Sequence, residues 1–259
     1  MRQLLRRLFI DMSSVVSQPK SGVYIMNGHY LTRSNNDDAE VFERQLKKLS
    51  RFARFIGVEE AIELVRSGGA LQVDETLMAF TFDDGFDDCF YSLAPILEEY
   101  NVNACFFVNP GFVDGNAKYQ QRFTDEVVLT QGKQPMSWEQ IKSLADRGFV
   151  IGNHTKDHIR LSAVSLEEAE SQVVSAKQIL EERLGAKCDY FAWPFGQYAD
   201  VNTEVIDMLL KHHSEVFSGC DFVNYMSYDN RVFNRRHFEA DWSVNEVKYF
   251  LAKKRVYCA

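Results

Sequence analysis

Short apolar runs alternate along this chain with longer segments whose apolar residues recur at helical spacing. The runs predict strands at 23–26, 77–82, 104–108, 149–151, 190–193 and 216–217. Helical periodicity and capping motifs predict helices at 37–56, 58–66, after Ser137, after Ser165, at 202–211 and from Ser243 to Leu251.

The alternation of buried-type strands with helices indicates an α/β protein with a parallel sheet covered by helices. Periodicity alone fits an open sheet as well as a barrel. Polar clusters follow three of the strands, at 83–84, 153–154 and 194–196. Because parallel strands bring their carboxyl ends to one face, these clusters favour a barrel or a close relative. We expect residues 1–259 to form a single domain.

The first polar cluster is Thr81-Phe82-Asp83-Asp84-Gly85. Two adjacent carboxylates at the end of a buried strand are costly unless a cation or hydrogen bonds compensate them. A metal ion would compensate one and leave the other ionised as a base. An acidic, solvated turn is an equal alternative for this cluster alone.

The second cluster, Asn153 to His158, contains two histidines four residues apart. If the segment forms a helical turn, both imidazoles lie on one face and suit a single Zn²⁺ ion. Taken alone, the spacing fits two unrelated surface histidines better. Together with an acidic cluster on a neighbouring strand, it predicts a metal site with one carboxylate, two imidazoles and open positions.

The third cluster is the turn Trp193-Pro194-Phe195-Gly196. Proline and glycine fix a tight turn, which leaves a backbone N–H free to stabilise an oxyanion. An ordinary strand-to-helix turn explains the same residues, and without the other clusters it is the better interpretation.

In this order the three motifs resemble the polysaccharide deacetylase family, also known as the NodB-homology domain or carbohydrate esterase family four. The matching elements are T-F-D-D-G at 81–85, H-T-x-x-H at 154–158 and P-F-G at 194–196, within a resemblance that spans about 23–217. The resemblance implies a distorted (β/α) barrel of about seven parallel strands.

The resemblance also implies roles for the residues. Asp83 corresponds to the general base, and Asp84, His154 and His158 to the ligands of a divalent metal, Zn²⁺ with Ni²⁺ or Co²⁺ as alternatives. The backbone N–H of Phe195, with Trp193 beside it, corresponds to the oxyanion and substrate contact.

The chain departs from the family pattern in its later motifs. Ala192-Trp193 stands where an arginine usually orients the base, and Asp241-Trp242 matches the family's Asp–Trp pair only in letters. His237 is our candidate for the general acid, with a structural or substrate-binding role as an equal alternative. Arg235 or Arg236 is a candidate to orient the base or to bind an anionic sugar group.

Composition narrows the class of partner. Apolar residues make up 46% of the chain, the net charge is −8, and no basic stretch interleaves with aromatics beyond residue 7. This argues against a nucleic-acid partner, because phosphate binding needs clustered Lys and Arg. Five cysteines include no C-x-x-C pair, which fits a reducing compartment better than a disulfide framework.

The amino-terminal segment begins like a signal peptide, but its apolar run stops at Asp11, and no stretch is long enough to span a membrane. We therefore expect a cytoplasmic protein. The segment contains Arg2, Arg6 and Arg7 beside leucines, a pattern that fits a short helix bound to the inner face of the membrane. A frayed basic end is the simpler interpretation.

The expected activity is hydrolytic removal of an N-acyl group from an amino sugar, and acetyl is the acyl group we expect. The substrate class is an N-acylated sugar or oligosaccharide of a polysaccharide, or its lipid- or nucleotide-linked precursor. A catalytically weak or inactive glycan-binding protein on the same scaffold is the main alternative, but pure binding has no need of the Asp83 base.

Overall fold

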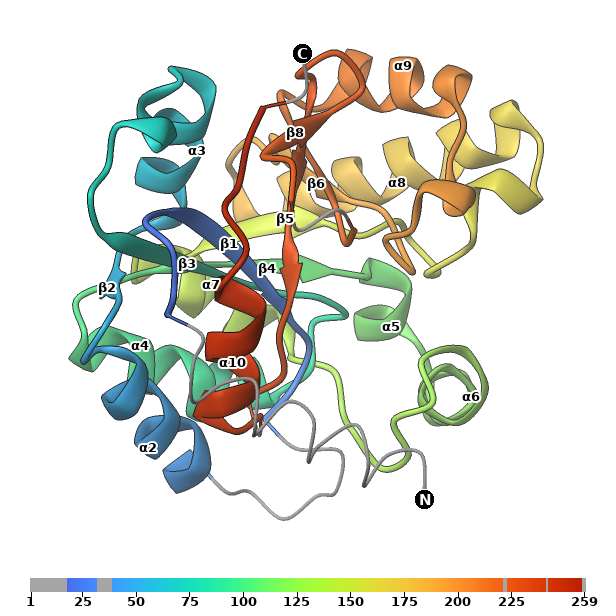
Figure 1. Cartoon of the computed structure of the whole chain (residues 1–259). Coiled ribbons are helices and arrows are strands. Elements are labelled where there is room, and N and C mark those ends of the chain that lie inside the picture. The colour runs from blue at the N-terminus through green and yellow to red at the C-terminus, as the bar shows by residue number, and fades with distance from the viewer. Residues whose placement is uncertain (1–17, 32–38, 221–222, 241, 258–259) are drawn as a thin grey trace, which may run out of the picture.

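The computed structural model describes residues 18–31, 39–220, 223–240 and 242–257 (Figure 1). The strands are β1 (Gly22–Gly28), β2 (Arg54–Phe55), β3 (Thr76–Phe82), β4 (Ala104–Val108), β5 (Val150–Asn153), β6 (Tyr190–Ala192), β7 (Glu215–Ser218), β8 (Met226–Ser227), β9 (Val232–Asn234) and β10 (Arg236–His237). The helices are α2 (Ala39–Leu49), α3 (Val58–Arg66), α4 (Ala94–Glu99), α5 (Pro110–Asp114), α6 (Ala117–Arg122), α7 (Trp138–Asp146), α8 (Leu166–Leu184), α9 (Thr203–His212) and α10 (Val244–Leu251).

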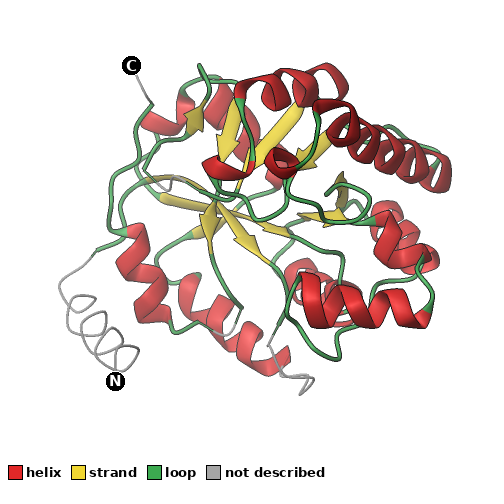
Figure 2. Ribbon diagram, turned by 90° about the vertical axis from the view of Figure 1, so that its right-hand side faces the viewer, coloured by secondary structure: helices red, strands yellow, loops and turns green. Residues whose placement is uncertain are grey.

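The strands form one curved sheet in the order β10-β1-β3-β4-β5-β6-β7-β9-β8, and β2 pairs with β3. Every neighbouring pair on this path is parallel except β8 with β9. Figure 2 shows the strands at the centre and the helices around the outside. The α/β fold with a parallel sheet is therefore confirmed.

The two ends of the sheet are joined by one short segment. β9 pairs with β7, and β10, which follows after the single residue Arg235, pairs with β1. The segment 232–237 thus takes the place of a seventh strand in a barrel whose other strands are β1, β3, β4, β5, β6 and β7. The result is the distorted barrel predicted above, with a seam at Arg235.

Side chains that point into the barrel alternate along each strand, as the pleat requires. Val23, Ile25, Leu77, Ala79 and Phe107 belong to one buried cluster with residues of α3. Further along the same strands, polar side chains take over on this face: Asn27 on β1 and Thr81 on β3 are both buried. The carboxyl ends of the strands therefore place a polar layer above an apolar barrel interior.

Most of the predicted elements are confirmed to within two or three residues, and the exception is the helix predicted at 37–56. Helix α2 ends at Leu49, and Arg54–Phe55 forms β2 beside β3. The Phe55 ring lies 5.3 Å from that of Phe80 and 5.2 Å from that of Tyr100. Phe55 thus continues the helical spacing of apolar residues but reaches the core from a strand. Periodicity alone could not distinguish this strand from one more turn of helix.

Three predicted helix starts have the expected caps. Ser137 and Ser243 form complete capping boxes with Gln140 and Glu246. Ser165 accepts a hydrogen bond from the Glu168 N–H at 3.2 Å.

Among the described helices, none has both the length and the apolar character to cross a bilayer. The predicted amino-terminal helix lies outside the described residues.

Candidate metal centre and active-site pocket

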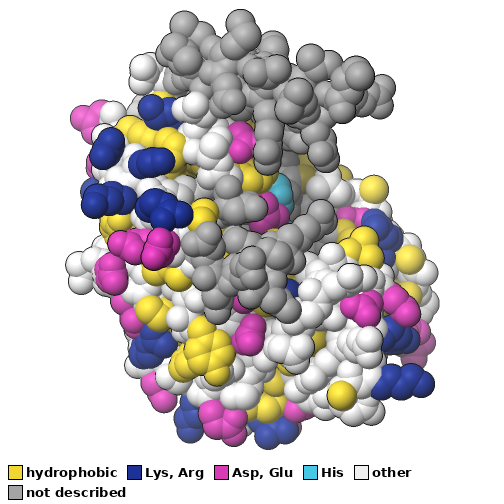
Figure 3. Space-filling model, turned by 90° about the horizontal axis from the view of Figure 1, so that it is seen from below, with side chains coloured by type: hydrophobic (Ala, Val, Ile, Leu, Met, Phe, Trp, Pro, Cys, Tyr) yellow, Lys and Arg dark blue, Asp and Glu magenta, His cyan; other side chains and the backbone are white. Residues whose placement is uncertain are grey.

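A pocket of about 540 Å³ opens at the carboxyl ends of the strands. Its floor is polar, with Asn27, Asp83, Asp84, His154 and His158 among the lining residues. Its rim includes Tyr30, residues 127–130 and Phe195. Figure 3 shows this face of the molecule, where histidine and acidic side chains lie at the bottom of a hollow. The volume is in the range of small-molecule sites.

Asp84, His154 and His158 meet at the floor of the pocket. Their candidate ligand atoms all lie within 4.8 Å of one another. Oδ1 of Asp84 is 3.6 Å from Nε2 of His154 and 3.2 Å from Nε2 of His158. All three side chains are at least 94% shielded from solvent. The structure therefore brings together the three residues predicted as metal ligands, and we call them the buried triad.

Unusual backbone conformations, and not the helical turn considered above, bring these side chains together. Residues 154–158 are irregular, and Thr155 and His158 have φ of 64° and 53°. Asp84 has φ of 73°. Left-handed φ in residues other than glycine is uncommon and tends to occur at functional sites. The expectation of one helical face for the two imidazoles was wrong, although both do face one point.

The donor atoms of the buried triad fit a divalent metal such as zinc. Nδ1 of His154 lies 2.7 Å from the carbonyl oxygen of Ala192, an arrangement that places the proton on Nδ1 and leaves Nε2 as a lone-pair donor. Burial lowers the pKa of His154 to about 4, which keeps the ring neutral. Oδ1 of Asp84 is buried and has no hydrogen-bond partner in the described residues. One carboxylate with a buried oxygen that lacks a hydrogen bond, together with two imidazoles, is a donor set that suits a zinc ion.

Asp83 lies beside the triad but is held by protein groups. Its two oxygens accept hydrogen bonds from the guanidinium of Arg235 at 2.7 and 2.8 Å, and Oδ2 also accepts one from Asn27 at 2.9 Å. Burial acts to raise the pKa of Asp83, but Arg235, together with His154 and His29, holds the pKa below its usual range. Asp83 is therefore a fixed, ionised carboxylate next to the triad, as a base requires.

Arg235 occupies the barrel seam and points inward. It is 1% exposed, and its guanidinium lies 5.0 Å from the Phe107 ring centre and donates to the Ser218 carbonyl at 2.9 Å. Of the two arginines considered above, Arg235 is thus the one that orients Asp83. Arg236, one residue further, points the other way and lies over the ring of Phe250 at 3.8 Å.

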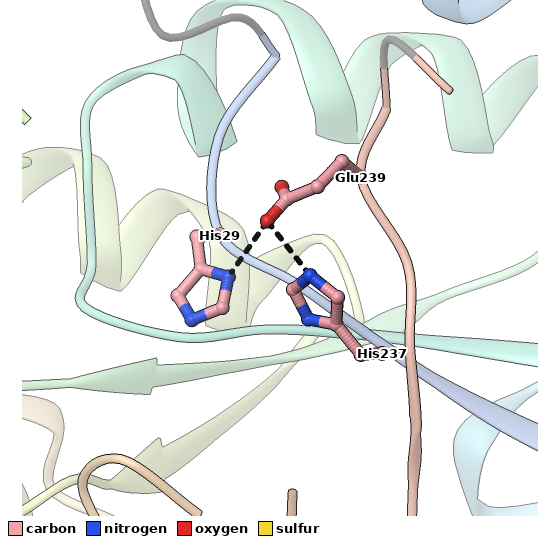
Figure 4. Close-up of side chains that lie close together, drawn as sticks. All are labelled: His29, His237 and Glu239. Carbon is pink, nitrogen blue, oxygen red and sulfur yellow. Dashed lines mark ion pairs between the residues drawn. The ribbon is translucent and has the colours of Figure 1, made fainter. Parts of the chain in front are cut away.

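A second group of titratable side chains lines the same pocket. His29 follows β1, His237 ends β10, and Glu239 comes two residues later. Oε1 of Glu239 is 3.6 Å from Nδ1 of His29 and 3.2 Å from Nε2 of His237 (Figure 4). We call this group the rim triad. Burial acts to lower the pKa of His29, but Glu239, Asp84 and Asp83 together raise the pKa to about 9.

The turn at 194–196 forms one wall of the pocket. Phe195 has φ of 65°, and its ring lies 4.8 Å from that of His158. A Cβ on Gly196 would stand 2.7 Å from the Cα of Gly219, so only glycine fits there. The Arg160 guanidinium, 4.4 Å above the Phe195 ring, also pairs with Asp200. These contacts fix the turn whose N–H was predicted to face the oxyanion.

Two other predicted substrate contacts lie elsewhere. The Trp193 side chain is 1% exposed in an apolar cluster, and its indole N–H donates to the Gln197 carbonyl at 3.1 Å. Neither Trp193 nor Arg236 is among the described residues that line the pocket. The geometry therefore gives these two side chains structural contacts in place of the substrate contacts expected.

His29 and Glu239 were not identified from the sequence. His29 stands in a Gly28-His29-Tyr30 segment without a second histidine or an acid nearby in sequence. The signal that points to it is position, since His29 immediately follows a buried strand whose carboxyl end faces the pocket. Asp241 lies outside the described residues, while Trp242 packs against His237 with ring centres 5.3 Å apart.

The barrel and its pocket define the class of protein as an α/β protein with its polar site at the carboxyl ends of the strands. The family model for polysaccharide deacetylases matches residues 70–211, and the chain belongs to this family. The matched segment contains Asp83 and the buried triad, whereas Arg235 and the rim triad lie outside it.

Two curated bacterial proteins are similar over part of the chain. A peptidoglycan-N-acetylglucosamine deacetylase from Bacillus cereus is 31% identical over 121 residues, 46% of this chain and 36% of that protein. YxkH from Bacillus subtilis is 23% identical over 124 residues, 48% of this chain and 38% of YxkH. The match thus spans little more than a third of the length of these relatives.

Solved structures agree over nearly the whole chain. IcaB from Ammonifex degensii has a TM-score of 0.69 and 23% identity, with 90% of this chain and 98% of that chain covered. The Streptococcus pyogenes deacetylase PplD, in complex with acetate, has a TM-score of 0.65 and 18% identity, covering 91% and 99%. At this level of identity the likeness shows the fold.

Proposed function

We propose that this protein is a metal-dependent deacylase that removes an acetyl group from an N-acetylated amino sugar of a polysaccharide or its precursor. The observation that carries the proposal is the position of Asp83. It is a buried, ionised carboxylate held by Arg235 and Asn27 beside three donor groups suited to zinc. Family membership supports the substrate class.

Asp84, His154 and His158 would hold the ion. When bound there, a divalent ion would polarise the acyl carbonyl and lower the pKa of water towards neutrality. Asp83 accepts a proton from the water molecule as its oxygen attacks the acyl carbon. The N–H of Phe195 donates to the oxyanion that develops on the former carbonyl oxygen. Collapse breaks the C–N bond and releases acetate.

The leaving amine needs a proton, and we assign its donation to His29. Of the two histidines of the rim triad, His29 lies close enough to Asp83 and Asp84 for their charges to raise its pKa. With a pKa of about 9, His29 is protonated at neutral pH and can act as an acid. His237, the acid predicted from the sequence, is 43% exposed, whereas His29 is 29% exposed.

The test is acetate release from a panel of N-acetylglucosamine oligomers, combined with metal analysis of each purified variant. Asp83→Asn should retain the metal and lose activity by about 10³-fold or more, because both the base and the charge beside the site disappear. His154→Ala should lose the tightly bound metal and the activity together. Asp87→Asn, in the same acidic segment but outside the pocket lining, is the matched control.

A silent glycan-binding protein would give a different pattern. It would bind the oligomers without releasing acetate, and Asp83→Asn would leave the binding constant near that of the wild type. If Asp83→Asn hydrolyses the substrate at the wild-type rate, the assignment of the base is wrong.

A further inference from the structure

The pocket holds two groups of the same composition, each with one carboxylate and two imidazoles. In the buried triad the carboxylate oxygen is 3.6 and 3.2 Å from the two ring nitrogens, and in the rim triad the corresponding distances are also 3.6 and 3.2 Å. Ligands at about 2.0–2.1 Å from a tetrahedral zinc lie about 3.3 Å apart. In both groups the carboxylate oxygen therefore lies at a distance from each ring nitrogen that suits two ligands of one zinc ion.

The atoms of the rim triad also have unused bonding capacity. Nδ1 of His29 and Oε2 of Glu239 are buried without a hydrogen-bond partner in the described residues. The three candidate ligand atoms lie within 4.8 Å of one another. The His237 ring packs edge-on against Trp242 and lies 5.8 Å from the ring of His29.

We propose that His29, His237 and Glu239 form a second zinc site, weaker than the first, whose occupation inhibits the enzyme. The binding part stands on the geometry alone, and the inhibition rests on the proposed function. Zinc on Nδ1 of His29 takes the place of a proton, which is released to solvent. The ring that remains is neutral, so it is a far poorer acid for the leaving amine.

The difference in surroundings sets the order of filling. Side chains of the rim triad are 29%, 43% and 18% exposed, against 2%, 6% and 4% in the buried triad. A backbone carbonyl fixes the proton of His154 in the buried triad. Since supporting contacts of this kind change metal affinity by about 10–100-fold, we expect the rim site to bind zinc weaker by about that factor.

Zinc binding can be counted on the metal-free full chain by equilibrium dialysis against buffered Zn²⁺, with isothermal calorimetry for the affinities. The wild type should bind two ions in two classes. His237→Ala should retain only the tight class, and His154→Ala only the weaker one. The matched control is His212→Ala, because His212 pairs with Glu170 at 2.8 Å but belongs to neither of the three-residue ligand groups found in the described residues. That variant should bind two ions.

The activity readout is the ratio of the rate at saturating zinc to the rate at one equivalent. We expect a fall of at least about tenfold in the wild type, since a general acid contributes about 10²–10⁴-fold. For His237→Ala the ratio should stay near one. A single class of zinc in the wild type, or two unchanged classes in His237→Ala, would overturn the proposal. Two classes of zinc without any acetate release would support this site and refute the proposed function.

Discussion

The two triads of the pocket have the same chemical composition and the same spacing, yet their surroundings give them different roles. The buried triad has a neutral histidine, because burial lowers the pKa of His154 to about 4. In the rim triad, Glu239 and the nearby aspartates raise the pKa of His29 to about 9. One imidazole is thereby prepared to bind a metal and the other to hold a proton. Composition and distance alone would not have separated them.

The variant His29→Gln should show the largest difference in catalytic rate between a change in the rim triad and the wild type. Loss of the acid should reduce kcat by about 10²–10⁴-fold, while the tightly bound zinc remains at one per chain. Kinetics at one equivalent of zinc together with metal analysis test this. A matched His237→Ala variant should lose much less activity. If His237→Ala is instead the more damaged of the two, the acid is His237 and our assignment to His29 is wrong.

A smaller loss of rate, accompanied by a loss of stability, is expected for Arg235→Met. Removing the guanidinium leaves Asp83 buried and uncompensated, which should lower the free energy of unfolding by about 3–5 kcal/mol. Urea denaturation measures the change. Arg231→Met, which breaks an exposed pair with Asp207, should cost no more than about 1 kcal/mol.

A double variant separates electrostatics from packing at this position. Adding Asp83→Asn to Arg235→Met removes the uncompensated charge, so the double variant should be more stable than Arg235→Met alone. An equal or lower stability of the double variant would show that the packing of Arg235 against Phe107, and not its pairing with Asp83, dominates.

The smallest effect at neutral pH should come from Glu239→Gln, but this variant has a distinct pH profile. The acid form of His29 is present below a pKa of about 9 in the wild type, so activity should fall as the pH rises through 9. Without the carboxylate, this alkaline limb should move to lower pH by about 1–2 units. Profiles of kcat/KM between pH 6 and 10 test the shift, and an unmoved limb would contradict the role given to Glu239.

Much of this fold could be predicted from the sequence because the strands are apolar, separate and flanked by capped helices. β4 and α3 have the predicted bounds. The short strands at the seam were not predicted. β9 and β10 have three and two residues, and they are strands only because β7 and β1 stand on either side of them. Such pairing depends on distant parts of the chain, which local periodicity does not encode.

The residues of the site also divide into those that local sequence predicts and those that only the fold brings together. Asp83, Asp84, His154 and His158 could be identified because each pair is adjacent or close in sequence. The partners that set their chemistry are remote. Arg235 is 152 residues from Asp83, and His29 is more than two hundred residues from Glu239 along the chain. Only the closed barrel brings them together, so the sequence indicated the metal ligands more clearly than it indicated the acid.

The seam at Arg235 has a consequence for the order in which the protein matures. The proposed base and metal ligands follow β3 and β5, within the segment 70–211, whereas Arg235 comes with the residues that close the barrel. If the proposed function holds, a chain synthesised from its amino terminus would therefore contain the whole buried triad before Arg235 is available to hold Asp83. We therefore expect metal binding to come before full activity during maturation, because activity would need Arg235 in the closed barrel.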